Sequence, residues 1–301
     1  MTQVRRNFPT WLTEKFLKLA GFRKNLFFYA HWKGSLGETS FPYGVELKDA
    51  KIFIQTLSEG GLEMTTLEEN TTSYSRYYEE NLYKLQNGIL NIVKESKAPF
   101  YLTGGTALSR CHYNHRYSDD LDFFLNADND FSSLAENVIL NFKKAGYSWD
   151  EDTEFYKSIG FYTMKVHSPD FEMGLKIDFV NDVKAHFGDI QEHEIFPRVD
   201  SVRNILSNKI SAATRFAAKD MADIREICLH EKFNWDEIFN EVQQKTLGLN
   251  PDTVSQIISG TPRSAFDKIR WTKKPSWEQF QEDLKKIAVD MLNLDKNTLC
   301  Q

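Results

Sequence analysis

The stretch Ser118-Asp119-Asp120-Leu121-Asp122-Phe123-Phe124-Leu125 alternates acidic and apolar side chains before it ends in three apolar residues. Side chains alternate between the two faces of a β-strand, so residues 121–125 are predicted to form a strand. Asp120, Asp122 and Phe124 would lie on one of its faces. The other face, turned toward a core, would carry Leu121, Phe123 and Leu125.

Two carboxylates on one strand face predict a site for a divalent cation. The Cα atoms of Asp120 and Asp122 would be about 7 Å apart, so their charges repel unless they are solvated, protonated or bridged. Mg²⁺ prefers oxygen ligands and commonly binds one or two carboxylates together with substrate phosphates. A solvated strand edge guarded by charges is the structural alternative. The adjoining Phe-Phe-Leu run favours the cation site over an exposed edge.

A third carboxylate follows in Leu175-Lys176-Ile177-Asp178-Phe179-Val180, which is also predicted to be a strand. Alternation places Lys176, Asp178 and Val180 on the face opposite to its core residues. If this strand lies beside residues 121–125, Asp178 completes a three-carboxylate cluster, which can hold two cations about 4 Å apart. Asp178 could instead accept the proton of an attacking hydroxyl. Taken alone, it is best explained as a solvated residue of an amphipathic strand.

A glycine pair, Gly104-Gly105, lies between a predicted strand over residues 100–102 and a helix that is predicted to begin at Ala107. Glycines let a ligand approach the backbone closely, and the free N–H groups of a helix N-terminus attract negative charge. Phosphate is therefore the expected ligand of residues 103–108. The alternative is a tight turn that requires glycine for its backbone geometry.

A predicted helix over residues 201–230 carries charges on a side that also bears apolar residues. At 100° per residue, Lys209 and Asp220 differ by about 20°, and Asp223 lies on the same side. On a straight helix Lys209 lies about 16 Å from Asp220. We therefore expect Lys209 to meet another anion, such as a triphosphate beside the glycine pair; an ordinary surface helix is the alternative. The same side carries two residues that are expected to face a core: Ala213 and Phe216.

The other patterns complete a mixed α/β (α+β) fold, in which helices flank a small mixed sheet and the C-terminal part is helical. A further strand is predicted over residues 161–166. Further helices are predicted over residues 46–57, 76–97, 131–145 and 276–293. The expected domain organisation is a mostly helical lead-in, a core, and a helical region packed on the core, over residues 1–97, 98–200 and 201–301.

Composition restricts the class of protein. The 301 residues are 41% hydrophobic, which excludes a disordered chain, and the net charge of −6 excludes a generally basic nucleic-acid-binding surface. The three cysteines form neither a CxxC motif nor a disulfide framework, which favours a reducing compartment. The longest early apolar run, residues 26–30, is far shorter than the roughly 20 residues of a membrane span. We expect a cytoplasmic protein that does not enter a membrane.

The order of a Gly-Gly turn, Asp-x-Asp on a strand and a further strand aspartate resembles the polymerase-β-like nucleotidyltransferase superfamily. More closely, the chain resembles the AbiEii/AbiGii-type toxin nucleotidyltransferases of bacterial toxin–antitoxin systems. The resemblance spans roughly residues 98–230 and implies a nucleotidyltransferase core. It rests on Gly-Gly-Thr-Ala-Leu (104–108), His-Arg-x-Ser-x-Asp-x-Asp-Phe-Phe (115–124), Ile-Asp-Phe (177–179) and a helical motif of Lys, Ala, Arg and two Asp (209–223).

The resemblance implies roles for individual residues. Mg²⁺, with two ions expected and Mn²⁺ as a substitute, would be held by Asp120, Asp122 and Asp178. These aspartates would be catalytic together with Lys209, which would neutralise phosphate charge, and Asp220, which would order the site. The nucleotide would be bound by Gly104, Gly105, Thr106, Arg116, Ser118 and Lys209. Family members usually have arginine before the helical aspartate, whereas this chain has Lys219, which cannot offer a bidentate fork.

The implied reaction is Mg²⁺-dependent transfer of a nucleoside monophosphate (NMP) from an NTP to an acceptor hydroxyl. By the same resemblance the acceptor is an RNA end such as a tRNA acceptor stem, and the protein is a toxin with a partner antitoxin. Transfer to a protein or a small molecule would use the same chemistry. A nucleotide-binding module with little turnover is the alternative of a different class, although the presence of all three acidic positions favours catalysis.

Overall fold

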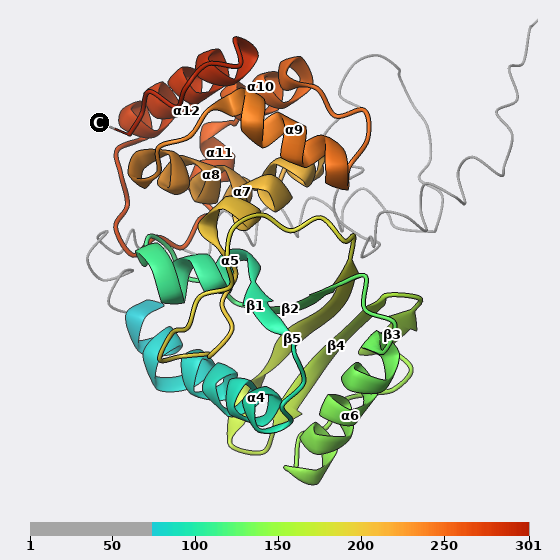
Figure 1. The fold of residues 1–301 in the computed structure, drawn as a ribbon. Coiled ribbons are helices and arrows are strands. Elements are labelled where there is room, and N and C mark those ends of the chain that lie inside the picture. Colours follow the sequence, from blue (N-terminus) through green and yellow to red (C-terminus); the bar gives the residue numbers. More distant parts are fainter. Residues whose placement is uncertain (1–73, 301) are drawn as a thin grey trace, which may run out of the picture. The chain divides into compact units, whose positions relative to one another are not determined.

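The computed structural model describes residues 74–300, which belong to one compact unit of the chain. The predicted helix over residues 46–57 and most of the lead-in over 1–97 lie outside the described residues. Residues 74–300 combine a five-stranded sheet with helices on both sides of it (Figure 1). The predicted α/β class, with a helical C-terminal part, is confirmed.

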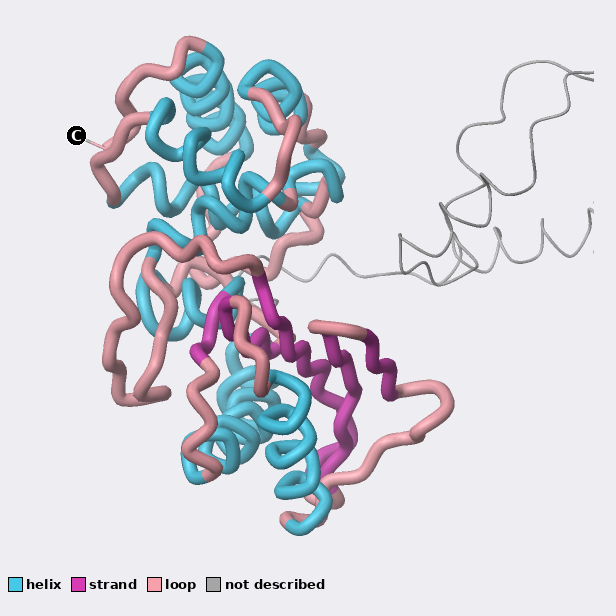
Figure 2. Tube along the Cα trace, turned by 45° about the vertical axis from the view of Figure 1, so that its right-hand side comes forward, coloured by secondary structure: helices cyan, strands magenta, loops and turns pink. Residues whose placement is uncertain are grey.

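The sheet is mixed and has the strand order β1-β2-β5-β4-β3 (Figure 1). Its strands are the magenta segments in Figure 2. β2 runs parallel to β5, whereas the other neighbouring pairs are antiparallel. The sequence pattern does not reveal β3, because the two central residues of this short edge strand are both exposed and give no alternation. The strands span Tyr101–Thr103 (β1), Leu121–Asn126 (β2), Phe155–Ser158 (β3), Phe161–Ser168 (β4) and Phe171–Asp182 (β5).

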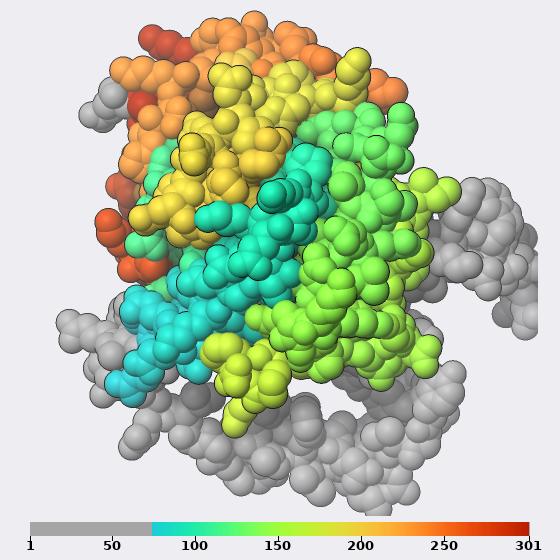
Figure 3. All heavy atoms as spheres, turned by 60° about the horizontal axis from the view of Figure 1, so that its bottom comes forward, coloured from blue at the N-terminus to red at the C-terminus, as the bar shows by residue number. Residues whose placement is uncertain are grey.

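One face of the sheet is apolar and packs against α4 (Tyr83–Glu95) and α6 (Phe131–Lys144), which lie next to each other (Figures 1 and 3). Rings from both helical and strand segments surround Phe179, among them Phe123 and Phe142. This packing fixes the register of β2 and β5, since a slip by one residue would bring their aspartates into the core. The predicted alternation is confirmed by the burial of Leu121, Phe123, Leu125, Leu175, Ile177 and Phe179.

The C-terminal helices gather on the polar side of the sheet (Figure 1), and their buried residues belong to the same hydrophobic core. The helix that is predicted over residues 276–293 is confirmed as α12. None of the helices within residues 74–300 has the length and apolar character that a membrane span requires. The division into three domains stays a prediction. The helices span Val202–Ser211 (α7), Ala218–His230 (α8), Trp235–Lys245 (α9), Pro251–Ser259 (α10), Arg263–Phe266 (α11) and Trp277–Leu292 (α12).

The predicted continuous helix over residues 201–230 is wrong. It is divided into α7 and α8, which are joined by a short 3₁₀ turn at Ala213–Arg215 (η3). Phe216 interrupts the helix because it adopts a left-handed φ of 54°, and it is 73% exposed instead of facing a core. Ala213 is buried, as predicted. Because of the interruption, α8 packs against α7, and residues that would be far apart on a straight helix can meet.

Candidate active site

A cavity of about 520 Å³ lies where the polar face of the sheet meets α7, α8 and α5 (Gly104–Ala107). Its walls come from all four sequence motifs, so the fold brings the predicted residues to one place. Thr106 is the one predicted site residue that does not line it. The others that do are Gly104, Gly105, Arg116, Ser118, Asp120, Asp122, Asp178, Lys209 and Asp220.

Three aspartates from the strands, Asp120, Asp122 and Asp178, form the group we name the sheet carboxylates. The parallel register of β2 and β5 places Asp122 opposite Asp178, so the two predicted strands are neighbours. Burial, and then the charge of Asp178, raise the pKa of Asp122 to about 6. Among residues 74–300, none donates a hydrogen bond to Asp122 or forms an ion pair with it. A buried carboxylate in this state is destabilising unless it is protonated or binds a cation.

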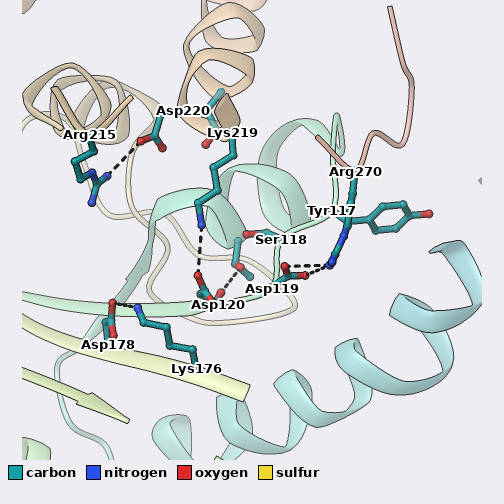
Figure 4. A network of polar contacts seen from close by, with 12 residues as sticks. Tyr117, Ser118, Asp119, Asp120, Lys176, Asp178, Arg215, Lys219, Asp220 and Arg270 are labelled. Carbon is teal, nitrogen blue, oxygen red and sulfur yellow. Dashed lines mark hydrogen bonds and ion pairs between the residues drawn. The ribbon is translucent and has the colours of Figure 1, made fainter. Parts of the chain in front are cut away.

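The other two sheet carboxylates each contact a lysine (Figure 4). Nζ of Lys219, on α8, lies 3.4 Å from Oδ2 of Asp120. Lys176, two residues before Asp178 on β5, forms an ion pair with Oδ2 of Asp178. The hydroxyl of Thr163 on β4 donates to Oδ1 of Asp178 at 2.6 Å. Both oxygens of Asp178 therefore already have donors.

The donor set fits a divalent cation at Asp120 and Asp122. Carboxylate oxygens are the ligands that Mg²⁺ prefers, and a positive charge would stabilise the ionised form of Asp122. Asp120, Asp122 and Asp178 line the same cavity, but within residues 74–300 no three His, Cys, Asp or Glu side chains are arranged to hold a metal ion. A role of Asp178 as a metal ligand stays a prediction. Thr163 and Lys176 already donate to the two oxygens of Asp178.

The glycine pair packs directly against side chains of the site. Gly104 has a φ of 68°, and a Cβ at this position would overlap with the carboxylate of Asp122. A Cβ at Gly105 would overlap with the guanidinium of Arg116 and lie 2.9 Å from Oγ of Ser118. Gly104 therefore requires glycine, and a side chain at Gly105 would force Arg116 and Ser118 to shift. The helix begins with this pair, earlier than predicted, and continues into a π-helical turn at Leu108–Tyr113 (η2).

Thr106 lies behind the glycine pair and is fully buried. Its hydroxyl donates to the backbone carbonyl of Asp120, which connects the turn to the start of β2. Asp119 points away from the cavity, where it accepts hydrogen bonds from Arg270 at 3.1 Å and from Tyr78 (Figure 4). The hydrogen bond from Thr106 to the backbone of Asp120 and the contacts of the preceding residue, Asp119, fix the position of Asp120 at the cavity. A direct role of Thr106 in nucleotide binding stays a prediction.

A second group of charges, which we name the helix cluster, consists of Arg116, Lys209, Arg215, Asp220 and Asp223. Nζ of Lys209 lies 2.6 Å from Oδ1 of Asp220 and 2.7 Å from Oδ2 of Asp223. The guanidinium of Arg116 donates two hydrogen bonds, of 2.7 and 2.6 Å, to the two oxygens of Asp223. Arg215 reaches Asp220 at 3.3 Å (Figure 4). Each carboxylate of this cluster thus has at least two cationic partners.

The cations of the helix cluster stabilise its two buried carboxylates. Burial alone would raise the pKa of Asp223, but Arg116 and Lys209 hold it well below its usual value. His115 adds a contact, with Nε2 2.8 Å from Oδ1 of Asp223. The prediction that Lys209 lies too far from Asp220 to pair with it is wrong, because the interruption between α7 and α8 brings the two side chains together.

Sequence reasoning misses two polar residues of the site, Lys176 and Thr163, as partners of Asp178. Strand alternation already places Lys176 on the same face as Asp178, so this contact could be anticipated. The contact of Thr163 depends on the register between β4 and β5, which no local pattern reveals. In the sequence, Lys219 is notable only because it departs from the family pattern. Its contact with Asp120 could not be predicted, because it depends on the path of the chain after α7.

The chain is similar to a family of known proteins and to two solved structures. A family model described as "Nucleotidyl transferase AbiEii toxin, Type IV TA system" matches residues 91–291, a range that contains every residue lining the cavity. The crystal structure of JHP933 from Helicobacter pylori is similar at 19% identity and a TM-score of 0.47, over 70% of this chain and 90% of that chain. A second H. pylori structure, described as a candidate nucleotidyltransferase, is similar at 18% identity and a TM-score of 0.47, over 71% and 96% of the two chains. No curated protein gives a significant match. With most of its length matched by the family model, the chain belongs to the AbiEii family of toxin nucleotidyltransferases.

Proposed function

We propose that the protein transfers NMP from an NTP to a hydroxyl at an RNA end, such as a tRNA acceptor stem, in a Mg²⁺-dependent reaction. The new bond joins the acceptor oxygen to the α-phosphorus, and pyrophosphate leaves. The observation that carries the proposal is the cavity of about 520 Å³, in which the sheet carboxylates face the glycine pair and several cationic side chains. Phosphoryl transfer needs this combination, because a divalent cation has to be held against the phosphates.

Asp120 and Asp122 are the residues that would hold Mg²⁺. Bound there, the ion would stabilise the negative charge that develops on the phosphates during the displacement. The family resemblance extends the proposal to Asp178 as a ligand and to a second ion. Mn²⁺ is the natural substitute, since it accepts the same oxygen ligands.

The triphosphate would lie between the glycine pair and the helix cluster. Lys209 uses two of its three N–H donors for Asp220 and Asp223, which leaves one for a phosphate oxygen. The helix cluster contains three cations and two carboxylates, so it retains a positive charge that favours a polyanion. Arg116 would contribute to nucleotide binding by supporting the glycine turn, because its guanidinium lies against Gly105.

The family suggests the biological setting of the reaction. The protein would be the toxin of a toxin–antitoxin pair, acting in the cytoplasm on NTP and RNA and bound by a partner antitoxin. Addition of a nucleotide to a tRNA acceptor stem would block translation. The AbiEii description supports the toxin–antitoxin setting, and the choice of RNA as the acceptor is our extension of it.

The test is incubation of the full chain with each α-labelled NTP in turn, Mg²⁺ and total RNA, followed by gel electrophoresis. We expect label from one or a few NTPs in a band of tRNA size and none without divalent cation. The matched control is D122N under the same conditions. Label in protein or in a small molecule would assign a different acceptor, and the absence of transfer to any acceptor with every NTP would contradict the proposal.

A further inference from the structure

The two lysines that contact the sheet carboxylates are held in different ways (Figure 4). Lys219 reaches Asp120 from α8, over 3.4 Å, with a side chain that is 55% exposed. Lys176 lies on the same strand and face as Asp178, so the backbone of β5 keeps its ammonium within reach of that carboxylate. The two lysine side chains are similarly exposed, at 55% and 49%, so the difference lies in the longer contact of Lys219 and in the shared strand face of Lys176 and Asp178. An arriving cation therefore displaces Lys219 from Asp120 more easily than it displaces Lys176 from Asp178.

Asp178 is also held from the adjacent strand. The register of β4 and β5 places Thr163 opposite Asp178, and the hydroxyl of Thr163 donates to the oxygen that Lys176 does not contact. A metal ion at Asp178 would have to displace a donor that the sheet itself positions. Among residues 74–300 no such donor contacts the carboxylate of Asp122, and that of Asp120 has only the exposed ammonium of Lys219, at 3.4 Å.

We propose that Lys176 takes the place of a second divalent ion at Asp178, so that the site binds one divalent ion, at Asp120 and Asp122. The inference rests on the proposed function and departs from the two ions that the family resemblance implies. One divalent ion and one ammonium balance the three negative charges of the sheet carboxylates. A second divalent ion about 4 Å from the first would add repulsion both from that ion and from Lys176. Lys219, once displaced, is free to approach the phosphates.

The test uses the full chain and Mn²⁺ alone, as a paramagnetic probe of the divalent site. Bound ions per chain are counted from the free Mn²⁺ signal in an electron paramagnetic resonance titration. The spectrum also reports distance, because two Mn²⁺ ions about 4 Å apart couple magnetically and lose the resolved hyperfine lines of an isolated ion. We expect the unsubstituted protein to bind one uncoupled ion.

The decisive variant is Lys176→Met, which keeps the apolar stem and removes the charge. We expect it to bind two ions with a coupled spectrum, because Asp178 then lacks its permanent counter-charge. Lys176→Arg should keep one ion, and Lys219→Met should keep one ion and bind it more tightly. Lys165→Met is the matched control, since Lys165 pairs in register with Lys176 but has Glu154 as its partner, and it should leave the count at one.

Two coupled ions in the unsubstituted protein, or a count of one in Lys176→Met, would overturn the inference. If Lys176→Met does not give a cooperative melting transition, Lys176→Gln replaces it in the same titration. Failure of the unsubstituted protein to bind any Mn²⁺ would instead refute the proposed metal site at Asp120 and Asp122, so the two failures are distinguishable.

Discussion

The sheet carboxylates and the helix cluster contain the same acidic residue type in one cavity, yet their electrostatic states are opposite. Asp122 has a raised pKa of about 6, because it is buried beside another carboxylate. Asp223 is fully buried, whereas Asp122 is only half-buried at the cavity, yet Arg116 and Lys209 hold the pKa of Asp223 well below its usual value. The sheet carboxylates have fewer cationic partners than negative charges, whereas the helix cluster has more cations than carboxylates.

This difference indicates that the sheet carboxylates bind a ligand, whereas the helix cluster holds parts of the fold together. A buried carboxylate that the fold leaves without a donor lowers stability, so it is retained only where a ligand supplies the missing charge. A buried carboxylate with two bidentate or short contacts connects elements that are distant in sequence. The comparison is therefore in line with the proposed cation binding at Asp120 and Asp122, and it gives the helix cluster a structural role in joining α7, α8 and Arg116.

The largest expected effect is on activity and comes from Asp122→Asn. The substitution keeps the shape of the side chain but removes the charge that would hold Mg²⁺, so we expect transfer to fall at least about 1,000-fold, or roughly 4 kcal/mol. Melting temperature without Mg²⁺ should hold or rise, because the repulsion from Asp178 is relieved. Asp170→Asn, at an exposed turn, is the control and should leave transfer unchanged. Full activity of Asp122→Asn would remove the sheet carboxylates from the reaction.

The second effect is on stability and comes from Asp223→Asn. The cations of Arg116 and Lys209 would lose a shared buried partner, so we expect the free energy of unfolding to fall by about 3 kcal/mol or more in urea denaturation. Asp267→Asn breaks exposed ion pairs with Arg263 and Lys274 and should cost less than about 1 kcal/mol. Equal effects of the two substitutions would show that the helix cluster does not assemble the cavity wall.

The third effect is the dependence of stability on pH that the raised pKa of Asp122 predicts. In the folded protein the pKa of Asp122 is about 6, above the value of about 3.9 that is expected for an unfolded chain. The folded state therefore binds this proton more tightly, and the contribution of Asp122 to stability should fall as pH rises from about 4 through about 6. Without Mg²⁺, the stability advantage of Asp122→Asn over the unsubstituted protein should be on the order of 1–3 kcal/mol at pH 7 and vanish near pH 4. An advantage that does not depend on pH would contradict the raised pKa.

The smallest effect concerns the glycine pair. The methyl group of Gly105→Ala would overlap with Arg116, which must shift, and would stand where the backbone approaches phosphate. We expect NTP affinity to fall at least tenfold, or about 1.4 kcal/mol, in equilibrium binding. Gly146→Ala is the control, since a Cβ there meets nothing within 4 Å, and its strain at a φ of 88° should affect stability without changing NTP binding. Unchanged affinity in Gly105→Ala would make the pair an ordinary turn.

Local patterns predict the sheet carboxylates well, because strand alternation is short-ranged and buried apolar partners enforce it. Leu121 and Phe123 fix the face of Asp122, and Ile177 and Phe179 fix that of Asp178. For the helix cluster, the sequence predicts which residues take part but not how they are arranged. Its geometry depends on Phe216, whose left-handed backbone no propensity favours for an aromatic residue. The partner of Asp178 on β4 depends in turn on a register that the sequence does not encode locally.

The most direct test of the difference between the two groups is the effect of Mg²⁺ on the melting temperature of the full chain and of D122N. Binding to the folded state alone stabilises by about 2.7 kcal/mol at a concentration 100 times the Kd, which is a shift of several degrees. We predict that Mg²⁺ raises the melting temperature of the unsubstituted protein and leaves that of D122N unchanged. An equal shift in both proteins would mean that the cation binds elsewhere and would contradict the assignment of cation binding to the sheet carboxylates.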